Sequence, residues 1–349
     1  MRWVWSDTRS WYPALLEAGV RVARTWDVRL VHAILRDART VTDAAALRAA
    51  TEWNAAAPDQ ATGDTLFDLD GGDAAYGPPS DADATLAEYR RQRTALASAG
   101  HADALRLLCA AESAGASIAV EMQTAGLPWS AAAHGQLLDE VLGPRRGGGL
   151  PARIEEAAAA VRDALGDPGA SLDSQPRLLR SLHRAGVLVD TTSRWELARH
   201  DHPVVAPLIA YKKLMRLYTA NGWSWLAEWV RDDRFRPVYV PAGVVTGRWA
   251  SSGGGALQIP RALRTAVRAD PGWVLVTADV AQLEPRVLAA MSRDTALAEA
   301  ASGRDLYQGI VDIGAVPSRG EAKLAMLGAM YGATTGESGR SEERRVGKE

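Results

Sequence analysis

The spacing of apolar residues changes along the chain and predicts many helices with a few short strands. The first apolar run, Trp3 to Trp5, has the length and composition of a strand. From Leu86 to Leu137 the apolar and alanine residues recur with helical spacing, and Gly126 interrupts them. A second break follows at Gly143. Val274 to Thr277 is a short run of apolar and β-branched residues, which predicts a buried strand.

One carboxylate, Asp279, follows this last predicted strand. The next apolar-periodic stretch, Val287 to Met291, predicts a helix, and Pro285 suits its first turn because no helix needs that N–H. The carboxyl end of a strand is where α/β sheets place their chemistry, and a carboxylate there can bind a divalent cation. The pattern alone leaves two interpretations open: a structural cap or a site residue.

A second candidate site is a stripe of four residues spaced four apart, Arg319, Lys323, Leu327 and Tyr331. On a helix this spacing places all four side chains on one slowly drifting face. Two cations can bind a triphosphate, and an aromatic ring offers a face on which a base can stack. The alternative is a solvated cationic edge beside a core Leu and Tyr.

Four segments occur in a characteristic order: TGRWASSGGGALQIP (246–260), DVAQLEPR (279–286), GRDLYQGI (303–310) and RGEAKLAMLGAMYG (319–332). Their order and spacing resemble the DNA polymerase I family, also called family A. There, TGRLSS…LQNIP precedes motif A, DYSQIELR, and motif B reads R-x3-K-x3-[FY]-G-x2-YG. The resemblance is strong from Tyr211 to Gly332 and fainter back to Leu86. The alanine- and arginine-rich composition and the twelve Trp resemble actinobacterial members with an exonuclease-like domain.

The resemblance implies a role for each matching residue. Asp279 would be catalytic and would bind both magnesium ions, with the backbone carbonyl of Val280 supporting one of them. Glu284 would exclude a ribose 2′-hydroxyl. The incoming nucleotide would be bound by Arg319, the catalytic Lys323, Leu327, Tyr331 and Tyr307.

The resemblance also implies contacts with primer–template DNA at Arg248 and Gln258. From the residues themselves, a predicted helix carries Lys212, Lys213 and Arg216, and clustered cations bind phosphates by releasing counterions. A solvated face is the alternative for this cluster. The net charge is −2, so DNA binding must come from local patches, which also include Arg261, Arg264 and Arg268.

The chain departs from the family pattern at several positions. Leu327 replaces the aromatic residue of motif B, which puts discrimination at the sugar 3′ position in doubt. Tyr307 stands where the family usually has a phosphate-facing His. Val280 and Ala281 replace Tyr and Ser, and the Asn expected between Gln258 and Ile259 is missing. We interpret these changes as a divergent branch with the same reaction.

Both ends of the chain carry their own expectations. The first 55 residues resemble the later part of a 3′–5′ exonuclease domain, but Trp11 stands where a carboxylate is needed and Asp27 matches a non-catalytic position. Residues 340–349 resemble a translated sequencing adapter, so we expect a non-native tail that does not pack. The family's third motif, with a second metal-binding Asp, is not found, and we expect this fragment to be inactive.

The expected fold is α+β: an incomplete right-hand polymerase fold, with a helical thumb, a partial palm and the start of the fingers, after an RNase H-like exonuclease remnant. The expected divisions are the remnant, an acidic flexible linker, the thumb, the palm with motif A, the fingers with motif B and the tail, at 1–55, 56–85, 86–235, 236–300, 301–339 and 340–349.

The expected function is DNA-directed DNA polymerase, a nucleotidyltransferase of DNA replication or repair. It would use Mg²⁺, primer–template DNA and deoxynucleoside triphosphates. A non-catalytic nucleic-acid-binding remnant and a nuclease are the alternatives. The single cysteine, Cys109, excludes an internal disulfide and cysteine-based zinc sites and fits a reducing compartment. With no signal peptide or spanning segment, we expect a cytoplasmic monomer that does not bind membranes.

Overall fold

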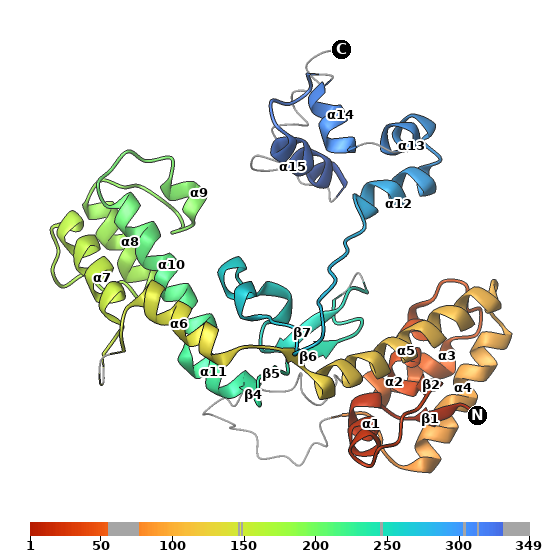
Figure 1. Cartoon of the computed structure of the whole chain (residues 1–349). Helices are drawn as coiled ribbons and strands as arrows, with labels where there is room; N and C mark the ends of the chain where they lie inside the picture. Colours follow the sequence, from red (N-terminus) through yellow and green to blue (C-terminus); the bar gives the residue numbers. More distant parts are fainter. Residues whose placement is uncertain are drawn as a thin grey trace. The chain divides into compact units, whose positions relative to one another are not determined.

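The computed structural model describes residues 1–54, 77–145, 147, 149–244, 247–302, 305–312 and 314–330. Helices dominate it, and the strands form small separate sheets, so the expected mixture of helix and strand is confirmed in this coarse form (Figure 1). The chain divides into two compact units, Met1–Val274 and Leu275–Glu349. Tyr331, the tail 340–349 and most of the expected linker lie outside the described residues.

The amino-terminal region begins with two parallel strands joined through a helix. The pairing sets Trp3 beside Thr25 and Trp5 beside Asp27. The expected first strand and the following helix–strand–helix are therefore present, in the elements β1 (Trp3–Trp5), α1 (Thr8–Glu17), β2 (Thr25–Asp27) and α2 (Val28–Asp37).

Asp27 has a structural role at the end of β2. Its carboxylate accepts hydrogen bonds from the backbone N–H of Leu30 (2.9 Å) and of Thr8 (2.8 Å), and so caps α2 and ties it to α1. Burial, together with the nearby carboxylate of Asp7, raises the pKa of Asp27 to about 6. These contacts agree with the non-catalytic interpretation of Asp27.

Two long helices cover these strands. The core between them contains Trp26, Trp53 and the fully buried Cys109, whose thiol pKa burial raises to about 12. The break expected at Gly126 is confirmed, because Gly126 has φ +71° and a Cβ there would lie 2.9 Å from Cβ of Arg234. The elements are α3 (Ala45–Ala49), η1 (Thr51–Asn54), α4 (Ala82–Ala97) and α5 (Ala102–Ala125).

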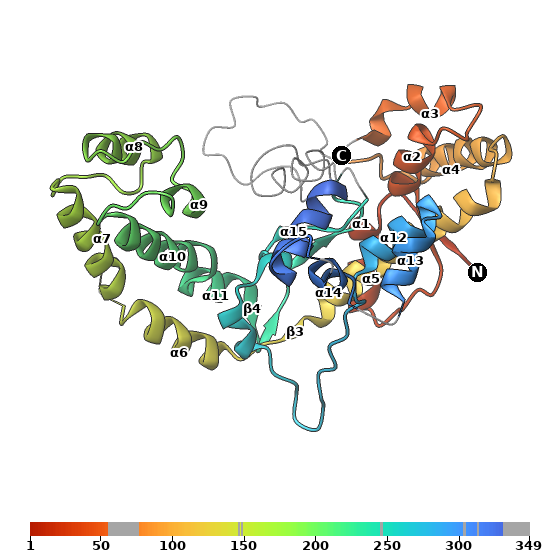
Figure 2. The same cartoon turned by 90° about the horizontal axis from the view of Figure 1, so that it is seen from above.

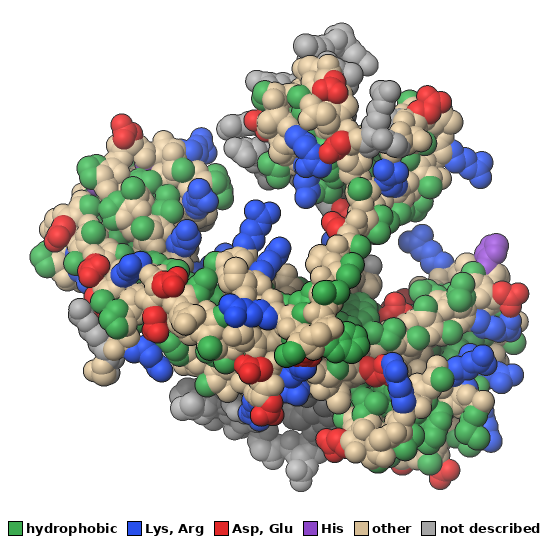
Figure 3. Space-filling view, in the orientation of Figure 1, with side chains coloured by type: hydrophobic (Ala, Val, Ile, Leu, Met, Phe, Trp, Pro, Cys, Tyr) green, Lys and Arg blue, Asp and Glu red, His purple; other side chains and the backbone are tan. Residues whose placement is uncertain are grey.

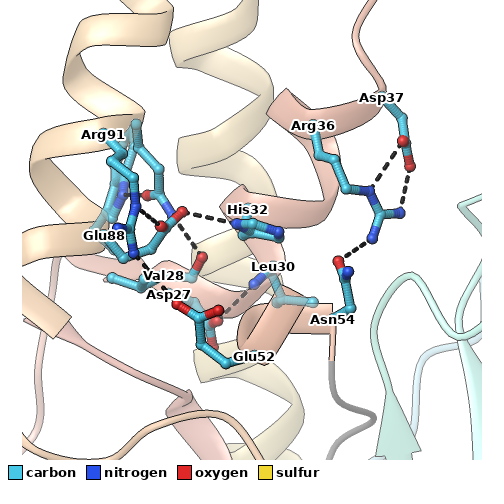
Figure 4. Close-up of polar contacts among 12 residues, drawn as sticks. Asp27, Val28, Leu30, His32, Arg36, Asp37, Glu52, Asn54, Glu88 and Arg91 are labelled. Carbon is cyan, nitrogen blue, oxygen red and sulfur yellow. Dashed lines mark hydrogen bonds and ion pairs between the residues drawn. The ribbon is translucent and has the colours of Figure 1, made fainter. Parts of the chain in front are cut away.

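A buried polar contact between His32 and Glu88 joins α2 to α4 (Figure 4). Nδ1 of His32 lies 2.8 Å from Oε1 of Glu88, and both side chains are fully buried. Arg91 donates to the other carboxylate oxygen at 2.6 Å, and Gln92 links Glu88 to the backbone carbonyl of Val28. Every oxygen of the Glu88 carboxylate therefore has a donor, which makes burial of its charge tolerable.

The next region is an all-helical bundle. Its core is built from Leu142, Ile154, Leu182 and Leu208, with α7 packed along α10 and with α8 and α9 beside them (Figure 2). The break expected from Gly143 separates the first two of its helices. The elements are α6 (Ala131–Leu142), α7 (Ala152–Leu165), α8 (Gln175–Arg184), α9 (Arg194–Leu197) and α10 (Val205–Asn221).

Short strands and an aromatic cluster complete the first unit. The sheet order is β3-β5-β4, and β6 pairs with β7. Trp129, Trp225 and Phe235 pack with ring centroids 4.9 to 5.5 Å apart. The elements are β3 (Leu127–Pro128), α11 (Trp223–Trp229), β4 (Val230–Arg231), β5 (Arg234–Phe235), β6 (Val238–Val240), β7 (Ala250–Gly253), η3 (Ala256–Gln258) and η4 (Arg261–Ala266).

The buried strand predicted at Val274–Thr277 is wrong for this structure. The segment is extended but belongs to no sheet, and Val274 and Val276 are 80% and 88% exposed. Its hydrophobic side chains lie at the surface (Figure 3). A strand exists only where a neighbour supplies hydrogen bonds, and no described residue pairs with this segment.

The second unit is helical where it is described. The helix predicted after Asp279 is present, with Pro285 in its first turn. The elements are α12 (Leu283–Ser292), α13 (Thr295–Ala301), α14 (Leu306–Asp312) and α15 (Arg319–Met330).

The Glu88–His32 pair gives a stability prediction. Glu88→Leu leaves the buried His32 without its partner. We therefore expect the free energy of unfolding to fall by about 3–5 kcal/mol at neutral pH. The double variant Glu88→Leu/His32→Leu should recover part of that loss, because two apolar side chains then pack together. Chemical unfolding followed by circular dichroism measures both, with the exposed Arg93→Leu on the same helix as control.

The stability that Glu88→Leu loses should also depend on pH. Burial alone would raise the pKa of Glu88, but hydrogen bonds from His32, Arg91 and Gln92 hold it below its usual value. The stabilisation is therefore present above the ordinary glutamate pKa and disappears as the pH falls through the lower pKa of the folded state. Equal stability losses at neutral and strongly acidic pH would contradict this assignment.

Candidate nucleotide pocket and cationic surfaces

The second unit contains an open cavity of about 820 Å³ lined by charged side chains. Three segments form its wall: the turn into α12, the start of α14 and one face of α15. Two carboxylates of the first segment thus share a cavity with the two cations of α15. The predicted site residues that line it are Asp279, Glu284, Tyr307, Arg319, Lys323 and Leu327.

A left-handed turn at Gln282 brings the first segment into the cavity. Gln282 caps α12 with φ +55°, a conformation that non-glycine residues rarely adopt. Its side-chain amide donates to Oδ1 of Asp305 at 2.8 Å, and its amide oxygen accepts from the backbone N–H of Leu306 at 3.1 Å. These two bonds join the turn to α14 and offset the cost of the turn.

Asp305 and Tyr307 together hold Arg319. Nε of Arg319 donates to Oδ2 of Asp305 at 2.7 Å, and its guanidinium carbon lies 5.4 Å from the centre of the Tyr307 ring. The hydrogen bond from Arg319 lowers the pKa of Asp305. Burial, aided by the nearby Glu284 carboxylate, raises the pKa of Tyr307, so its hydroxyl stays protonated at neutral pH.

The expected stripe on α15 is present as far as it is described. Arg319, Lys323 and Leu327 all line the cavity, while Ala322 and Gly328 are the buried residues of the helix. Tyr331, the fourth member, lies outside the described residues. The four-residue spacing therefore predicted a shared face correctly for three residues.

The metal ligands implied by the resemblance fit Mg²⁺ only in part. Asp279 and the carbonyl of Val280 are oxygen donors of the kind Mg²⁺ prefers, and both residues are exposed. Asp305 is already paired with Arg319. The described residues contain no group of three or more His, Cys, Asp or Glu placed to bind a metal ion. Asp279 and Val280 could therefore supply only part of a coordination shell.

The three candidate phosphate-binding residues of α10 differ in their surroundings. Lys212 donates to the backbone carbonyl and the hydroxyl of Thr192, and burial lowers its pKa. Its ammonium thus fastens the loop before α9 to α10. Lys213 and Arg216 are exposed one helical turn apart, and this spacing places them on a common face.

The other DNA-contact candidates lie on the surface of the first unit. Arg248 precedes β7 and Gln258 ends η3, and both are exposed. Arg261 and Arg264 lie on η4, where residues three apart eclipse each other, and Arg268 follows; all three are exposed.

Sequence reasoning missed two residues that organise the cavity, Gln282 and Asp305. Both stand inside the quoted segments, but no role was assigned to either of them. A usable signal existed for Asp305, because Asp is a strong N-cap candidate and the helix begins at the next residue. The signal for Gln282 is weak, since its φ cannot be read from composition.

Comparison with known proteins supports the resemblance. A profile of DNA polymerase family A matches residues 177–340. DNA polymerase I of Chloroflexus aurantiacus is 30% identical over 178 residues, 46% of this chain and 19% of that protein. The thermostable DNA polymerase I of Thermus thermophilus is 30% identical over 154 residues, 39% of this chain and 18% of that protein. The chain thus spans about a fifth of these relatives.

A solved structure extends the comparison to the fold. The polymerase domain of Pol1 from M. smegmatis, determined with DNA primer–template and dNTP, matches with a TM-score of 0.67. The match covers 95% of this chain and 59% of that chain at 22% identity, so it concerns the fold. Separately, none of the helices among the described residues combines the length and apolar character that crossing a membrane requires.

The family profile, the two homologous polymerases and the ordered motifs that line one cavity lead to the same conclusion. Residues 177–340 match DNA polymerase family A, and the chain is similar to members of that family over this part.

Proposed function

We propose that this chain contributes the nucleotide-binding and DNA-binding parts of a DNA-directed DNA polymerase. The observation that carries the proposal is the single cavity that collects the carboxylates of motif A and the cations of motif B. Incorporating a nucleotide requires a triphosphate to be bound beside a metal-binding carboxylate, and these are the groups that meet there.

Each candidate site residue takes one part of this function. Arg319 and Lys323 bind the phosphates of the incoming nucleotide through charge-assisted hydrogen bonds. Glu284, in the first turn of α12, lies beside the sugar and excludes a 2′-hydroxyl. Leu327 and Tyr331 flank the sugar and base. Magnesium, held in part by Asp279 and Val280, would activate the attacking oxygen and stabilise the leaving group.

Exposed cationic and polar side chains of the first unit bind the DNA duplex. Lys213, Arg216, Arg248 and Gln258 contact the primer–template backbone, and Lys212 supports this surface by holding the loop at Thr192. In this proposal the helical bundle is the thumb, the region around β6, β7 and motif A is part of the palm, and α14 and α15 begin the fingers.

A non-catalytic nucleic-acid-binding role is the second candidate. It is favoured by the single exposed carboxylate, Asp279, in a cavity where Asp305 is already neutralised by Arg319. Primer extension by the 349-residue chain with Mg²⁺ separates the two roles. Incorporation that disappears in Asp279→Ala favours the polymerase, whereas binding without incorporation favours the second role for this chain.

Triphosphate binding tests the pocket directly. Lys323→Gln removes one charge from the cavity and should weaken binding of a deoxynucleoside triphosphate about tenfold. Arg293→Gln removes the same charge from an exposed position outside the cavity and should have little effect. Isothermal titration calorimetry measures both. Equal effects of the two variants would mean that general electrostatic attraction to the protein, and not this pocket, binds the triphosphate.

Binding to primer–template DNA should separate two neighbouring lysines. Lys213→Gln should lower the slope of log affinity against log salt by about 0.9, the value for one phosphate contact. Lys212→Gln should change this slope less, because its ammonium already binds Thr192. Fluorescence anisotropy over a salt series gives both slopes. A larger change for Lys212 would reverse the assignment.

Sugar selection tests the proposed role of Glu284. Glu284→Ala opens space beside the 2′ carbon, so the preference for deoxynucleoside over ribonucleoside triphosphates should fall about tenfold. The comparison uses the same base in both sugars and the exposed Glu299→Ala as a control. An unchanged preference would remove Glu284 from the sugar-selecting position.

A further inference from the structure

Asp305 occupies the centre of the cavity's hydrogen-bond network. Its Oδ1 accepts from the side-chain amide of Gln282 at 2.8 Å, and its Oδ2 accepts from Nε of Arg319 at 2.7 Å. Oδ1 also accepts from the backbone N–H of Tyr307 at 3.0 Å, in the first turn of α14. One carboxylate thus joins the turn of motif A, the start of α14 and the first residue of motif B.

We infer that Asp305 is a positioning residue that orients the Arg319 guanidinium toward an incoming triphosphate, with the Tyr307 ring as the second support. The inference rests on the proposed nucleotide-binding function. It also gives Tyr307, which replaces the usual His, a role through Arg319 instead of a direct phosphate contact.

The geometry favours positioning over competition for the guanidinium. Asp305 uses only Nε of Arg319, and neither Nη atom has an acceptor among the described residues. The Tyr307 ring lies against the guanidinium and is itself almost completely buried, at 6% exposure. A guanidinium fixed along one edge and supported by a ring keeps its outer donors in a set direction, which reduces the entropy lost when an anion binds.

The charge on Asp305 allows one substitution to distinguish a positioning role from a purely electrostatic one. If Asp305 affected the triphosphate only through its charge, Asp305→Asn would tighten binding, because a repelling carboxylate is lost. If it orients Arg319, the same change should weaken binding about threefold to tenfold, the cost of ordering one long side chain. The two explanations therefore predict opposite signs. Asn remains a good helix cap, so α14 should persist.

The experiment measures binding of deoxyadenosine triphosphate with Mg²⁺ to the full chain by calorimetry. Asp312→Asn is the matched control, since Asp312 lies on the same helix and accepts from Gln308 without touching Arg319. In an Arg319→Gln background, the weakening caused by Asp305→Asn should vanish. Tyr307→Leu should weaken binding more than Tyr307→Phe does, because Phe keeps the ring that lies against Arg319.

The outcomes distinguish this inference from the function on which it rests. A chain that binds the triphosphate but shows unchanged or tighter binding in Asp305→Asn overturns the positioning role alone. A weakening by Asp305→Asn that persists without Arg319 also overturns it. Failure of the unaltered chain to bind any triphosphate overturns both this inference and the proposed pocket.

Discussion

The cavity of the second unit depends on one left-handed turn and the amide that secures it. Gln282 has a backbone conformation that costs free energy for any residue with a Cβ, and its side chain offsets that cost by bonding both Asp305 and the backbone of Leu306. Without this turn, Asp279 and Glu284 would not line the same cavity as Arg319. The strained backbone of Gln282 and the hydrogen bonds of its side chain to Asp305 and Leu306 therefore depend on each other.

The helices and the α15 stripe could be predicted because their information is local. Helical spacing, the glycine breaks at Gly126 and Gly143, and the four-residue interval of Arg319 and Lys323 all act within a few turns of chain. Residues of motif A and motif B line one cavity. Their chemical roles remain proposals, since geometry alone does not assign them.

The features that could not be predicted from the sequence depend on contacts between residues distant in sequence. Val274–Thr277 has the composition of a strand, but strand formation also requires a neighbour, which no local pattern can supply. Lys212 and Lys213 look equivalent in sequence, yet only Lys212 reaches Thr192, twenty residues away. Asp305 was overlooked for the same reason: its importance lies in three contacts, of which the sequence reveals only the helix cap.

The exposed segment 273–277 also bears on how the chain behaves in solution. It is a run of apolar and β-branched residues in which Trp273 is 77% exposed, and no described strand pairs with residues 274–277. Such a segment is a template for edge-to-edge pairing with any strand that approaches, including the same segment of another copy. Association between copies, more than the thermodynamic stability of either unit, would then limit the concentration at which this polypeptide stays in solution.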